Sequence, residues 1–457
     1  MVKLNSSTIL AEVLLYMKQN YLNTRQFALK LDINVGTCSY LLNGARTLTA
    51  DHLDRITEVL GFPKGHFYEN YIHEYLQDLD PNWRRIGPFL RKCAEIGKLD
   101  CIRETVSLLL DDLTYTTPLF DMAEELFENG NYAAAEILYE NVAMSEKRQY
   151  SERLALCEYR LFKIRIGEDQ VRNLKFAYQF EPFVDRLDEV RQLDALKDLA
   201  NLYRSVRQWD RVEALAHEME HKAKILYFNE KRSAAKFQEM QRKLSRPLFV
   251  YIAYAKLLCA DVCEGRNDFE KALQYTYEYA DLSWVRETDA DTKHWLDLFQ
   301  KWSQANTYAN KLMGGDIGVL PEYVEYLRQH PVEILQGLFN ILYAANRHQM
   351  DVDHILQQFS SEIEAYERQQ TNDFYMSQVI PDYFNKFLYD LTYYYVRKGD
   401  YENGFKYMMP GLENSVMINK EDSIIKFMVL FEQVRHIASE ELCLKYKNIV
   451  SEVRQVV

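Results

Sequence analysis

The sequence predicts an all-α protein that begins with a small domain of short helices and continues as a right-handed superhelix of helical hairpins. Three observations lead to this prediction. Apolar residues recur at helical spacing along the chain, only 16 Gly and 10 Pro interrupt its 457 residues, and one hairpin pattern occurs four times. Because one hydrophobic core rarely serves so long a chain, we expect a small domain and one long second body.

Charge is distributed unevenly between these two parts. Residues 1–70 contain seven Lys or Arg and six Asp or Glu, a formal charge of +1, whereas the remainder contains 48 and 62, a formal charge of −14. An acidic body repels DNA phosphates, so any DNA binding should reside in the first seventy residues. No apolar run suits a membrane span and the start lacks the layout of a signal peptide, so we expect a cytoplasmic protein without membrane contact.

The first 72 residues are expected to form five short helices. Thr24 is placed to cap the second helix, and a tight turn at Asp32 precedes the third. Asn43 and Gly44 should end the third helix in a left-handed conformation, and Thr49 or Asp51 should cap the fourth. The first four helices are expected near residues 9–17, 25–31, 34–42 and 53–60. Their apolar positions include Ile9, Val13, Leu14, Met17, Phe27, Ala28 and Leu31.

This stretch, TRQFALKLDINVGTCSYLLNGARTLTADHLDRITEVLGF, resembles the phage-repressor-like (XRE-type) helix-turn-helix domain. The resemblance covers about sixty residues of the domain expected at 1–72, and it is most specific at the third-helix segment that closes in LLNGAR. In that family the second helix lies on the DNA backbone and the third enters the major groove. Carried over by position, the resemblance implies that Asn34, Val35, Gly36, Ser39 and Tyr40 face bases. It implies phosphate contacts for Thr24, Asn43 and Arg46.

The stretch also departs from the family pattern. Family members often have Gly where Asp32 stands, and often Gln, Arg or Lys near the start of the third helix. Here Asn34 is the side chain able to make a bidentate contact, the type that suits adenine. Since basic residues are few, the alternative is a helix-turn-helix that has lost DNA binding and only mediates protein contacts.

Beyond this domain, Pro81 and Pro88 mark a junction at residues 73–95, and helical hairpins are expected over residues 96–457. Each copy of the hairpin pattern has a polar pair that can cap the next helix, an aromatic residue, and a small or apolar residue three positions later. The pattern resembles the tetratricopeptide repeat, in which the small residue lets two helices approach and the aromatic fills the space between neighbouring hairpins. The four pairs are Tyr132 with Ala135, Trp209 with Val212, Phe269 with Ala272, and Tyr401 with Gly404.

A tetratricopeptide-like superhelix implies a concave face lined by the first helix of each hairpin. Alignment on the pattern places Lys197, Asn201 and Arg204 on one stripe of that face, at positions similar to those that clamp peptide backbone and carboxylate in peptide-binding members. An amide can pair with an extended peptide and a Lys with its carboxylate. The alternative is a solvated polar face, which every amphipathic helix has. The same alignment projects further residues into the groove: Phe120, Glu124, Tyr254, Asp261, Lys386, Tyr389 and Tyr393.

One segment, AHEMEHKA, matches the H-E-x-x-H zinc motif at His217 and His221, with Glu218 placed to act as a base. Zincin helices usually carry uncharged residues between the ligands, so Glu220 argues against a metal. The seven cysteines are scattered and odd in number, and no P-loop or nucleophile elbow occurs. We therefore expect no metal, no cofactor and no enzymatic activity.

A helix-turn-helix joined to such a superhelix resembles the RRNPP peptide-responsive regulators, a group that includes PlcR-type regulators and arbitrium receptors. The resemblance implies a homodimer that reads a pseudo-palindromic operator on double-stranded DNA. It also implies that a short signalling peptide enters the groove and changes the affinity for DNA, as in quorum sensing. The rival from another class is an interaction protein similar to Rap-type proteins, whose helical body binds a signalling protein and not DNA. A zinc peptidase is the third alternative.

Overall fold

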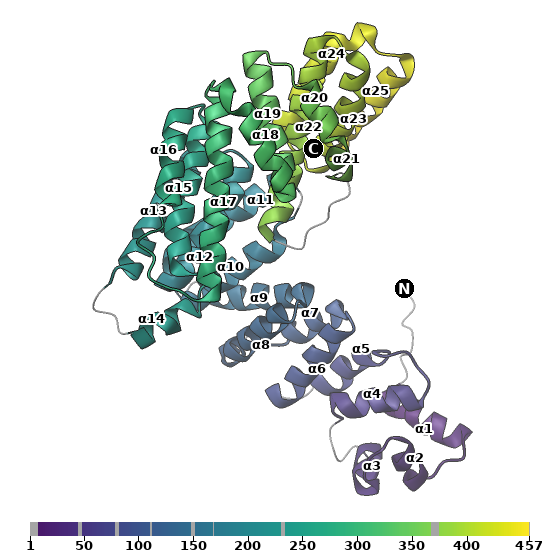
Figure 1. Cartoon of the computed structure of the whole chain (residues 1–457). Helices are drawn as coiled ribbons and strands as arrows, with labels where there is room; N and C mark the ends of the chain where they lie inside the picture. The colour runs from purple at the N-terminus through teal and green to yellow at the C-terminus, as the bar shows by residue number, and fades with distance from the viewer. Residues whose placement is uncertain are drawn as a thin grey trace. The chain divides into compact units, whose positions relative to one another are not determined.

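The computed structural model of the chain describes residues 8–43, 48–77, 82–109, 112–147, 151–167, 169–229, 234–366 and 374–456. These residues form helices joined by turns and contain no strand, which confirms the predicted all-α class. The chain divides into two compact units, residues 1–164 and 165–457, which Figure 1 colours from purple to yellow along the sequence. No helix within the described ranges has both the length and the apolarity needed to cross a membrane.

In the first unit, the helices predicted for the helix-turn-helix are α1 to α4, and six further α-helices follow them in its described part. In chain order its helices are α1 (Ile9–Gln19), α2 (Thr24–Lys30), α3 (Val35–Leu42), α4 (Ala50–Val59), α5 (Tyr68–Tyr71), α6 (Trp83–Glu95), α7 (Leu99–Ser107), α8 (Thr116–Glu128), α9 (Tyr132–Glu146) and α10 (Glu152–Arg165), the last of which ends at the unit boundary.

Side-chain caps fix the starts of α2 and α3. The Asn23 side chain accepts a hydrogen bond from the N–H of Gln26, and the Gln26 side chain accepts one from the N–H of Asn23. The cap predicted at Thr24 is therefore one residue off, because these reciprocal bonds form a capping box at Asn23. Asn34 caps α3, its Oδ1 accepting from the N–H of Gly36 at 2.7 Å.

The turn between α2 and α3 is held by a bond from α4. Asp32 has a φ of +53°, a conformation that a residue with a side chain adopts at a cost. The guanidinium of Arg55 donates to the carbonyl of Leu31 at 3.0 Å and pairs with the Asp32 carboxylate at 3.2 Å. These contacts stabilise the turn at Asp32. At the other end of α3, Asn43 has a φ of −92°, so the predicted left-handed ending does not occur at that residue.

The apolar stripes of this domain lie as predicted, with one exception. Phe27, Ala28 and Leu31 are buried, as are the apolar residues Ile9, Val13 and Met17 of α1. Leu14 is instead 49% exposed, because it lies on the outer flank of α1 beside the buried row.

The predicted junction at residues 73–95 is folded in its described part. Its second half is α6, which packs against α4, α7 and α8 and buries Ile86, Phe89 and Leu90. Pro88 lies inside this helix, where it lacks the N–H that would bond to the preceding turn. Burial of the apolar face offsets that loss.

The second unit consists mainly of helical hairpins packed in succession. In chain order its helices are α11 (Gln170–Phe180), α12 (Glu189–Ser205), α13 (Trp209–Tyr227), α14 (Ala234–Gln241), α15 (Leu248–Gly265), α16 (Phe269–Ala280), α17 (Ala290–Met313), α18 (Leu320–Gln329), α19 (Ile334–His348), α20 (Asp353–Gln358), α21 (Ser360–Tyr366), α22 (Phe374–Lys398), α23 (Tyr401–Met417), α24 (Glu421–Val434) and α25 (Glu440–Val456).

The hairpin pattern read from the sequence marks four helix starts. Helices α9, α13, α16 and α23 begin at its aromatic residues, Tyr132, Trp209, Phe269 and Tyr401. The residue two positions earlier is left-handed in all four hairpins: Gly130 (φ +79°), Arg207 (φ +58°), Asn267 (φ +60°) and Gly399 (φ +82°). Glycine adopts this conformation without penalty and ends helices in this way, whereas arginine does so at a cost.

Close helix approach at the small positions is confirmed. Ala135, Val212 and Ala272 are fully buried, and a Cβ added to Gly404 would lie 2.9 Å from the Val396 side chain. The aromatic position varies more. The Trp209 ring covers Gly265 of the next hairpin, where an added Cβ would lie 2.3 Å from it.

Tyr132 departs from the expected role of the aromatic residue. Its side chain is 51% exposed and contacts Phe127 of its own hairpin, with ring centroids 5.3 Å apart. It therefore does not fill the space between neighbouring hairpins.

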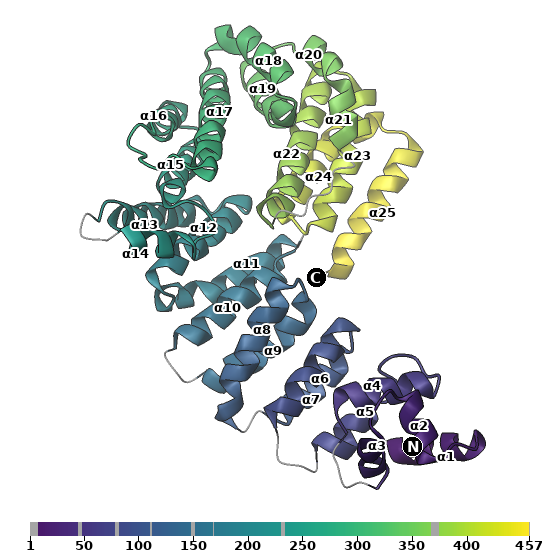
Figure 2. The same ribbon diagram turned by 60° about the horizontal axis from the view of Figure 1, so that its bottom comes forward.

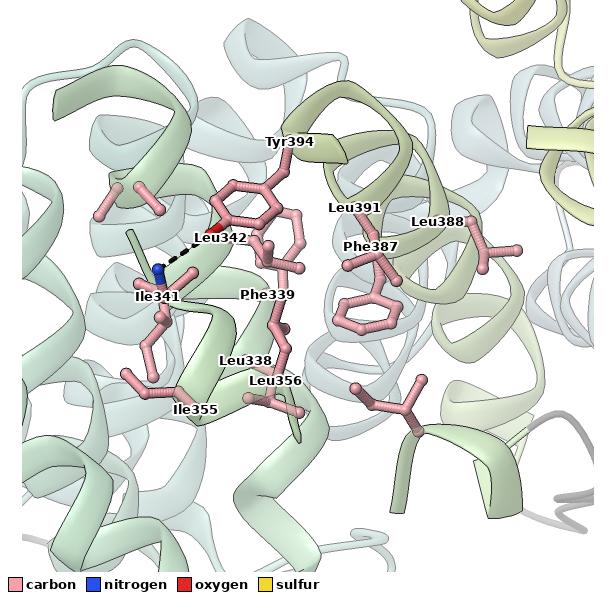
Figure 3. Packing of buried hydrophobic residues seen from close by; sticks show 14 of the residues in the cluster. Leu338, Phe339, Ile341, Leu342, Ile355, Leu356, Phe387, Leu388, Leu391 and Tyr394 are labelled. Carbon is pink, nitrogen blue, oxygen red and sulfur yellow. Dashed lines mark hydrogen bonds between the residues drawn. The ribbon is translucent and has the colours of Figure 1, made fainter. Parts of the chain in front are cut away.

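A large apolar cluster joins α19, α20 and α22 (Figure 3). Leu338, Leu342, Phe387 and Leu391 are at most 1% exposed. Tyr394 is fully buried, and its hydroxyl accepts a hydrogen bond from the N–H of Val352 at 3.0 Å. This cluster fixes the position of α22, which carries several of the predicted site residues.

The second unit closes on itself. Helix α22 returns to contact α12 (Figure 2). The ammonium of Lys420, in the turn before α24, donates to the carbonyl of Ser205 at 2.9 Å, and the N–H of Gln170 donates to the carbonyl of Ile418 at 3.1 Å. These bonds join the first and the last hairpins of the unit, so α12 is enclosed by neighbours and buries most of its length.

Candidate functional site

The helix-turn-helix presents one exposed face on α3. Asn34, Val35, Gly36, Tyr40 and Asn43 are exposed along it, and Tyr40 is 59% accessible although it is aromatic. The other predicted contacts lie differently, since Ser39 and Thr24 are half-buried and Arg46 lies outside the described residues. Of the five residues that the resemblance assigned to bases, all but Ser39 are therefore exposed to solvent.

Capping limits what Asn34 can offer to DNA. Its Oδ1 already accepts from the N–H of Gly36, so a bidentate contact with adenine would use the second lone pair of that oxygen together with the amide N–H. The exposed cations of α1 and α2 are Lys18, Arg25 and Lys30. These three are further candidates for phosphate contacts, in addition to the residues that the helix-turn-helix resemblance implied.

The second unit encloses a polar cavity of about 280 Å³. Its walls come from α12, α13, α15, α16, α17, α19 and α22 and from the hairpin turns after α12 and α15. Three of the predicted groove residues, Arg204, Asp261 and Lys386, meet there. The lining residues are Arg204, Ser205, Arg207, Trp209, Asp261, Glu264, Gly265, Asn267, Phe269, Met313, Gln336, Phe339, Asn340, Tyr343 and Lys386.

The charged groups of this cavity are strongly perturbed by burial. Arg204 Nε lies 2.6 Å from Asp261 Oδ2. Burial raises the pKa of Asp261 to about 6 despite this partner, and burial together with the nearby Asp261 raises the pKa of Glu264 to about 7. Burial and the charge of Arg207 lower the pKa of Lys386 to about 7. Such shifts mark places where charges are kept in a poorly solvated space.

Lys386 rests on an aromatic ring and not on a carboxylate. Its Nζ lies 3.9 Å from the centroid of the Phe339 ring. Asp390, one turn further along α22, has a pKa that burial raises to about 6, and its Oδ2 accepts no hydrogen bond from the described residues.

The predicted stripe of α12 does not form one open surface. Lys197 lies 3.4 Å from Asp194 and 3.3 Å from Asp198, and its ammonium donates to Ser245 at 3.2 Å. Asn201 is only 5% exposed. Lys197 and Asn201 therefore bond to other residues of the chain and are not available to a ligand. The segment before α15 covers Lys197 through Ser245, and α15 covers Asn201 through Tyr254.

The other predicted groove residues are scattered. The Tyr254 hydroxyl donates to Asn201 Oδ1 at 2.6 Å, away from the cavity lining. Tyr389 packs edge-on against Phe427 at 5.4 Å, and Tyr393 is 40% exposed. In the first unit, Glu124 pairs with Arg160 at 2.8 Å, and Phe120 packs against Tyr139.

Several lining residues were not foreseen. Arg207 and Asn267 lie in hairpin turns, where helical periodicity gives no signal, although both occupy the turn position that is Gly in two other hairpins. That substitution was visible in the sequence. Glu264 lies on α15 one turn beyond Asp261, and Asn340 and Gln336 belong to α19, whose hairpin lacks the aromatic pattern.

The H-E-x-x-H segment lies on α13. His217 and His221 are exposed, whereas Glu220 is buried and pairs with Lys256 of α15 at 3.1 Å and with Lys224 at 2.6 Å. Within the described residues, no three or more His, Cys, Asp or Glu side chains are grouped to hold a metal ion.

Comparisons with known proteins give little for this chain. No family model matches it, and no curated protein matches it. Among solved structures, a circular tandem repeat protein with novel repeat topology and enhanced subunit contact surfaces aligns with 98% of this chain and 99% of its own, at 10% identity and a TM-score of 0.17. That score is too low to indicate a shared fold.

Proposed function

We propose that this chain is a cytoplasmic DNA-binding transcriptional regulator whose operator affinity is controlled by a short peptide bound in the cavity of the second unit. The observation that carries the DNA-binding part is the exposed face of α3. An aromatic and an aliphatic side chain, Tyr40 and Val35, stand open to solvent there beside Asn34. On a helix that enters the major groove, apolar side chains can contact the methyl group of thymine.

The cavity supports the ligand-binding part. Its volume is close to the lower end of the range for ligand sites, about 300 Å³, and it combines charged, amide and aromatic groups, as peptide sites do. Binding there must change the affinity for DNA if the two units form one regulator, and DNA must change the affinity for the peptide by the same factor.

The homodimer is part of the same proposal. Its support is the outer face of α24, where Ile425 and Val429 are more than half exposed and Met428 is half-buried. Apolar side chains that are grouped and exposed on one face are typical of a surface that another molecule covers. We expect Ile425→Asp to convert a dimer into a monomer in analytical ultracentrifugation, and a monomeric wild type would refute this assignment.

The test of DNA binding is a gel shift of the full-length protein with genomic fragments at increasing salt. The variant Tyr40→Glu adds a negative charge to the exposed face of α3 and should weaken binding about tenfold or more. Tyr277→Glu, at a similarly exposed tyrosine on α16, is the matched control and should bind like the wild type. If the wild type shifts no fragment even at low salt, the interaction protein similar to Rap-type proteins becomes the better explanation.

A further inference from the structure

We propose that the cavity binds a carboxylate of its ligand between Arg207 and Lys386. This deepens the proposed function, because it names the chemical group that the same cavity recognises. The first argument is charge. The lining contains three cationic and two anionic side chains, and Arg204 and Asp261 neutralise each other. Among the described lining residues this leaves Arg207 and Lys386 with Glu264, a formal excess of one positive charge. Asp390 of α22 lies outside the lining and also attracts both cations.

The second argument is that these two cations form no internal ion pair. In the described part of the chain, neither Arg207 nor Lys386 pairs with a carboxylate. Lys386 instead contacts the ring of Phe339, and Asp390 on the same helix stays out of ion-pair distance. Both cations are half-buried. A cation that is partly removed from water without an ion-pair partner is unfavourable, and a bound anion relieves that cost.

The third argument is the conformation of Arg207. It occupies the left-handed turn position that is Gly130 and Gly399 in two other hairpins. Arginine in this conformation costs on the order of 1 kcal/mol relative to glycine. Of the four equivalent turns, those with a side chain, at Arg207 and Asn267, are the two that line the cavity. Arg207 therefore keeps an unfavourable backbone conformation at a turn that lines the cavity, where a ligand can contact its side chain.

The fourth argument is the geometry with which these two side chains can bind a carboxylate. A guanidinium can hold a carboxylate through two parallel N–H bonds, and an ammonium supplies a third donor. Gln336 and Asn340 of α19 line the same space and offer amide groups to the peptide bond that precedes a C-terminal carboxylate. The carboxylate could equally belong to an acidic side chain or to a free carboxylic acid, and the experiment separates these sources.

The test uses the full-length protein and a mixed hexapeptide library in two forms, with free C-terminal carboxylates and with C-terminal amides. Peptides retained through gel filtration are counted by mass spectrometry. We expect the free-acid form to be retained about tenfold more, the loss expected for a charge-assisted pair of hydrogen bonds. If peptides without Asp or Glu are retained equally in both forms, the C-terminal assignment is wrong. The bound group would then be a side-chain carboxylate, and a library free of Asp and Glu tests this directly.

Two variants and a control locate the site. Arg207→Gly restores the residue found in two equivalent turns, so the fold should be retained, while the preference for the free-acid library should disappear. Lys386→Met should act in the same way, and Lys406→Met, at an exposed lysine of α23, should change nothing. If Arg207→Gly and Lys386→Met both keep the preference, the proposal is wrong.

A second measurement separates this inference from the proposed function. Succinate, with succinamide as its neutral counterpart at equal ionic strength, is added to the wild type and to Arg207→Gly during thermal unfolding. If succinate stabilises only the wild type and no peptide is retained from either library, the carboxylate site is supported. The same result contradicts the proposal that the ligand is a peptide. Absence of any effect from peptides and succinate would refute the carboxylate site, while the gel shift still decides DNA binding.

Discussion

Asn34 caps α3 with the same side chain that the helix-turn-helix resemblance assigns to base recognition. Two substitutions separate these roles. Asn34→Ser keeps a capping oxygen but lacks the amide, so the free energy of unfolding should stay within a few tenths of a kcal/mol while base preference is relaxed. Asn34→Ala should lose both and destabilise by about 1 kcal/mol. Urea unfolding and selection from a randomised DNA pool measure the two effects. Unchanged base preference in Asn34→Ser would remove Asn34 from the readout.

Glu264 provides a prediction of pH dependence. Its pKa is raised by burial to about 7 in the folded protein, so the folded state holds a proton that the unfolded state has released between about pH 4.5 and 7. The buried charge therefore destabilises the folded chain above pH 7, and this penalty disappears as the pH falls toward 4.5. Glu264→Gln should stabilise the chain at pH 8 and have little effect at pH 5, measured by urea unfolding at both values. An equal effect at both would show that Glu264 is well solvated.

Between neighbouring elements, the contact of α13 with α15 depends on the absence of a side chain. A Cβ at Gly265 would lie 2.3 Å from the Trp209 ring. Gly265→Ala should therefore destabilise the chain by about 1–3 kcal/mol through overpacking. Gly167 has open space around its Cα and no left-handed backbone, so Gly167→Ala is the matched control and should change the free energy of unfolding by under about 1 kcal/mol. If both variants unfold alike in urea, the indole moves aside without penalty.

At this scale the sequence predicted where hairpins turn and missed how they pack. The helix starts at Trp209 and Tyr401 follow from a polar cap and an aromatic residue, which are local features. The exposure of Tyr132 was not predictable from such features, because it depends on what the neighbouring elements cover. The pattern did not mark the hairpin of α17 and α19, because its helices lack the aromatic signature and are held by long-range apolar burial.

For the second unit as a whole, the bond that closes it links residues far apart in the sequence, and this leads to a prediction. Lys420 bonds to the carbonyl of Ser205, 215 residues away. Lys420→Ala should remove a bond worth about 1 kcal/mol and speed hydrogen exchange at the end of α12 several-fold. Lys426→Ala, on an exposed side chain of α24 paired with Asp422, should leave that exchange unchanged. If exchange in α12 is insensitive to Lys420→Ala, the unit is held closed by apolar contacts alone.

The same long-range closure explains which part of the candidate site could be foreseen. Helical periodicity gave the faces of α12, α15 and α22 on which Arg204, Asp261 and Lys386 lie. It could not show that these faces meet, since 182 residues separate Arg204 from Lys386. Nor could it show that Lys197 forms ion pairs with Asp194 and Asp198 and is covered. The covering residue, Ser245, lies 48 positions further along the chain.

Closure also constrains how this unit can have diversified. In an open array each repeat touches only its neighbours, so a gene can gain or lose a repeat and still encode a folded protein. Here the turn before α24 must reach α12, so one hairpin more or one fewer would separate Lys420 from Ser205. Duplication and deletion of whole hairpins are then selected against, and the existing hairpins change by substitution in place. Divergence of that kind erases the regular spacing of a repeat, and the aromatic markers of the second unit, Trp209, Phe269 and Tyr401, stand 60 and 132 residues apart.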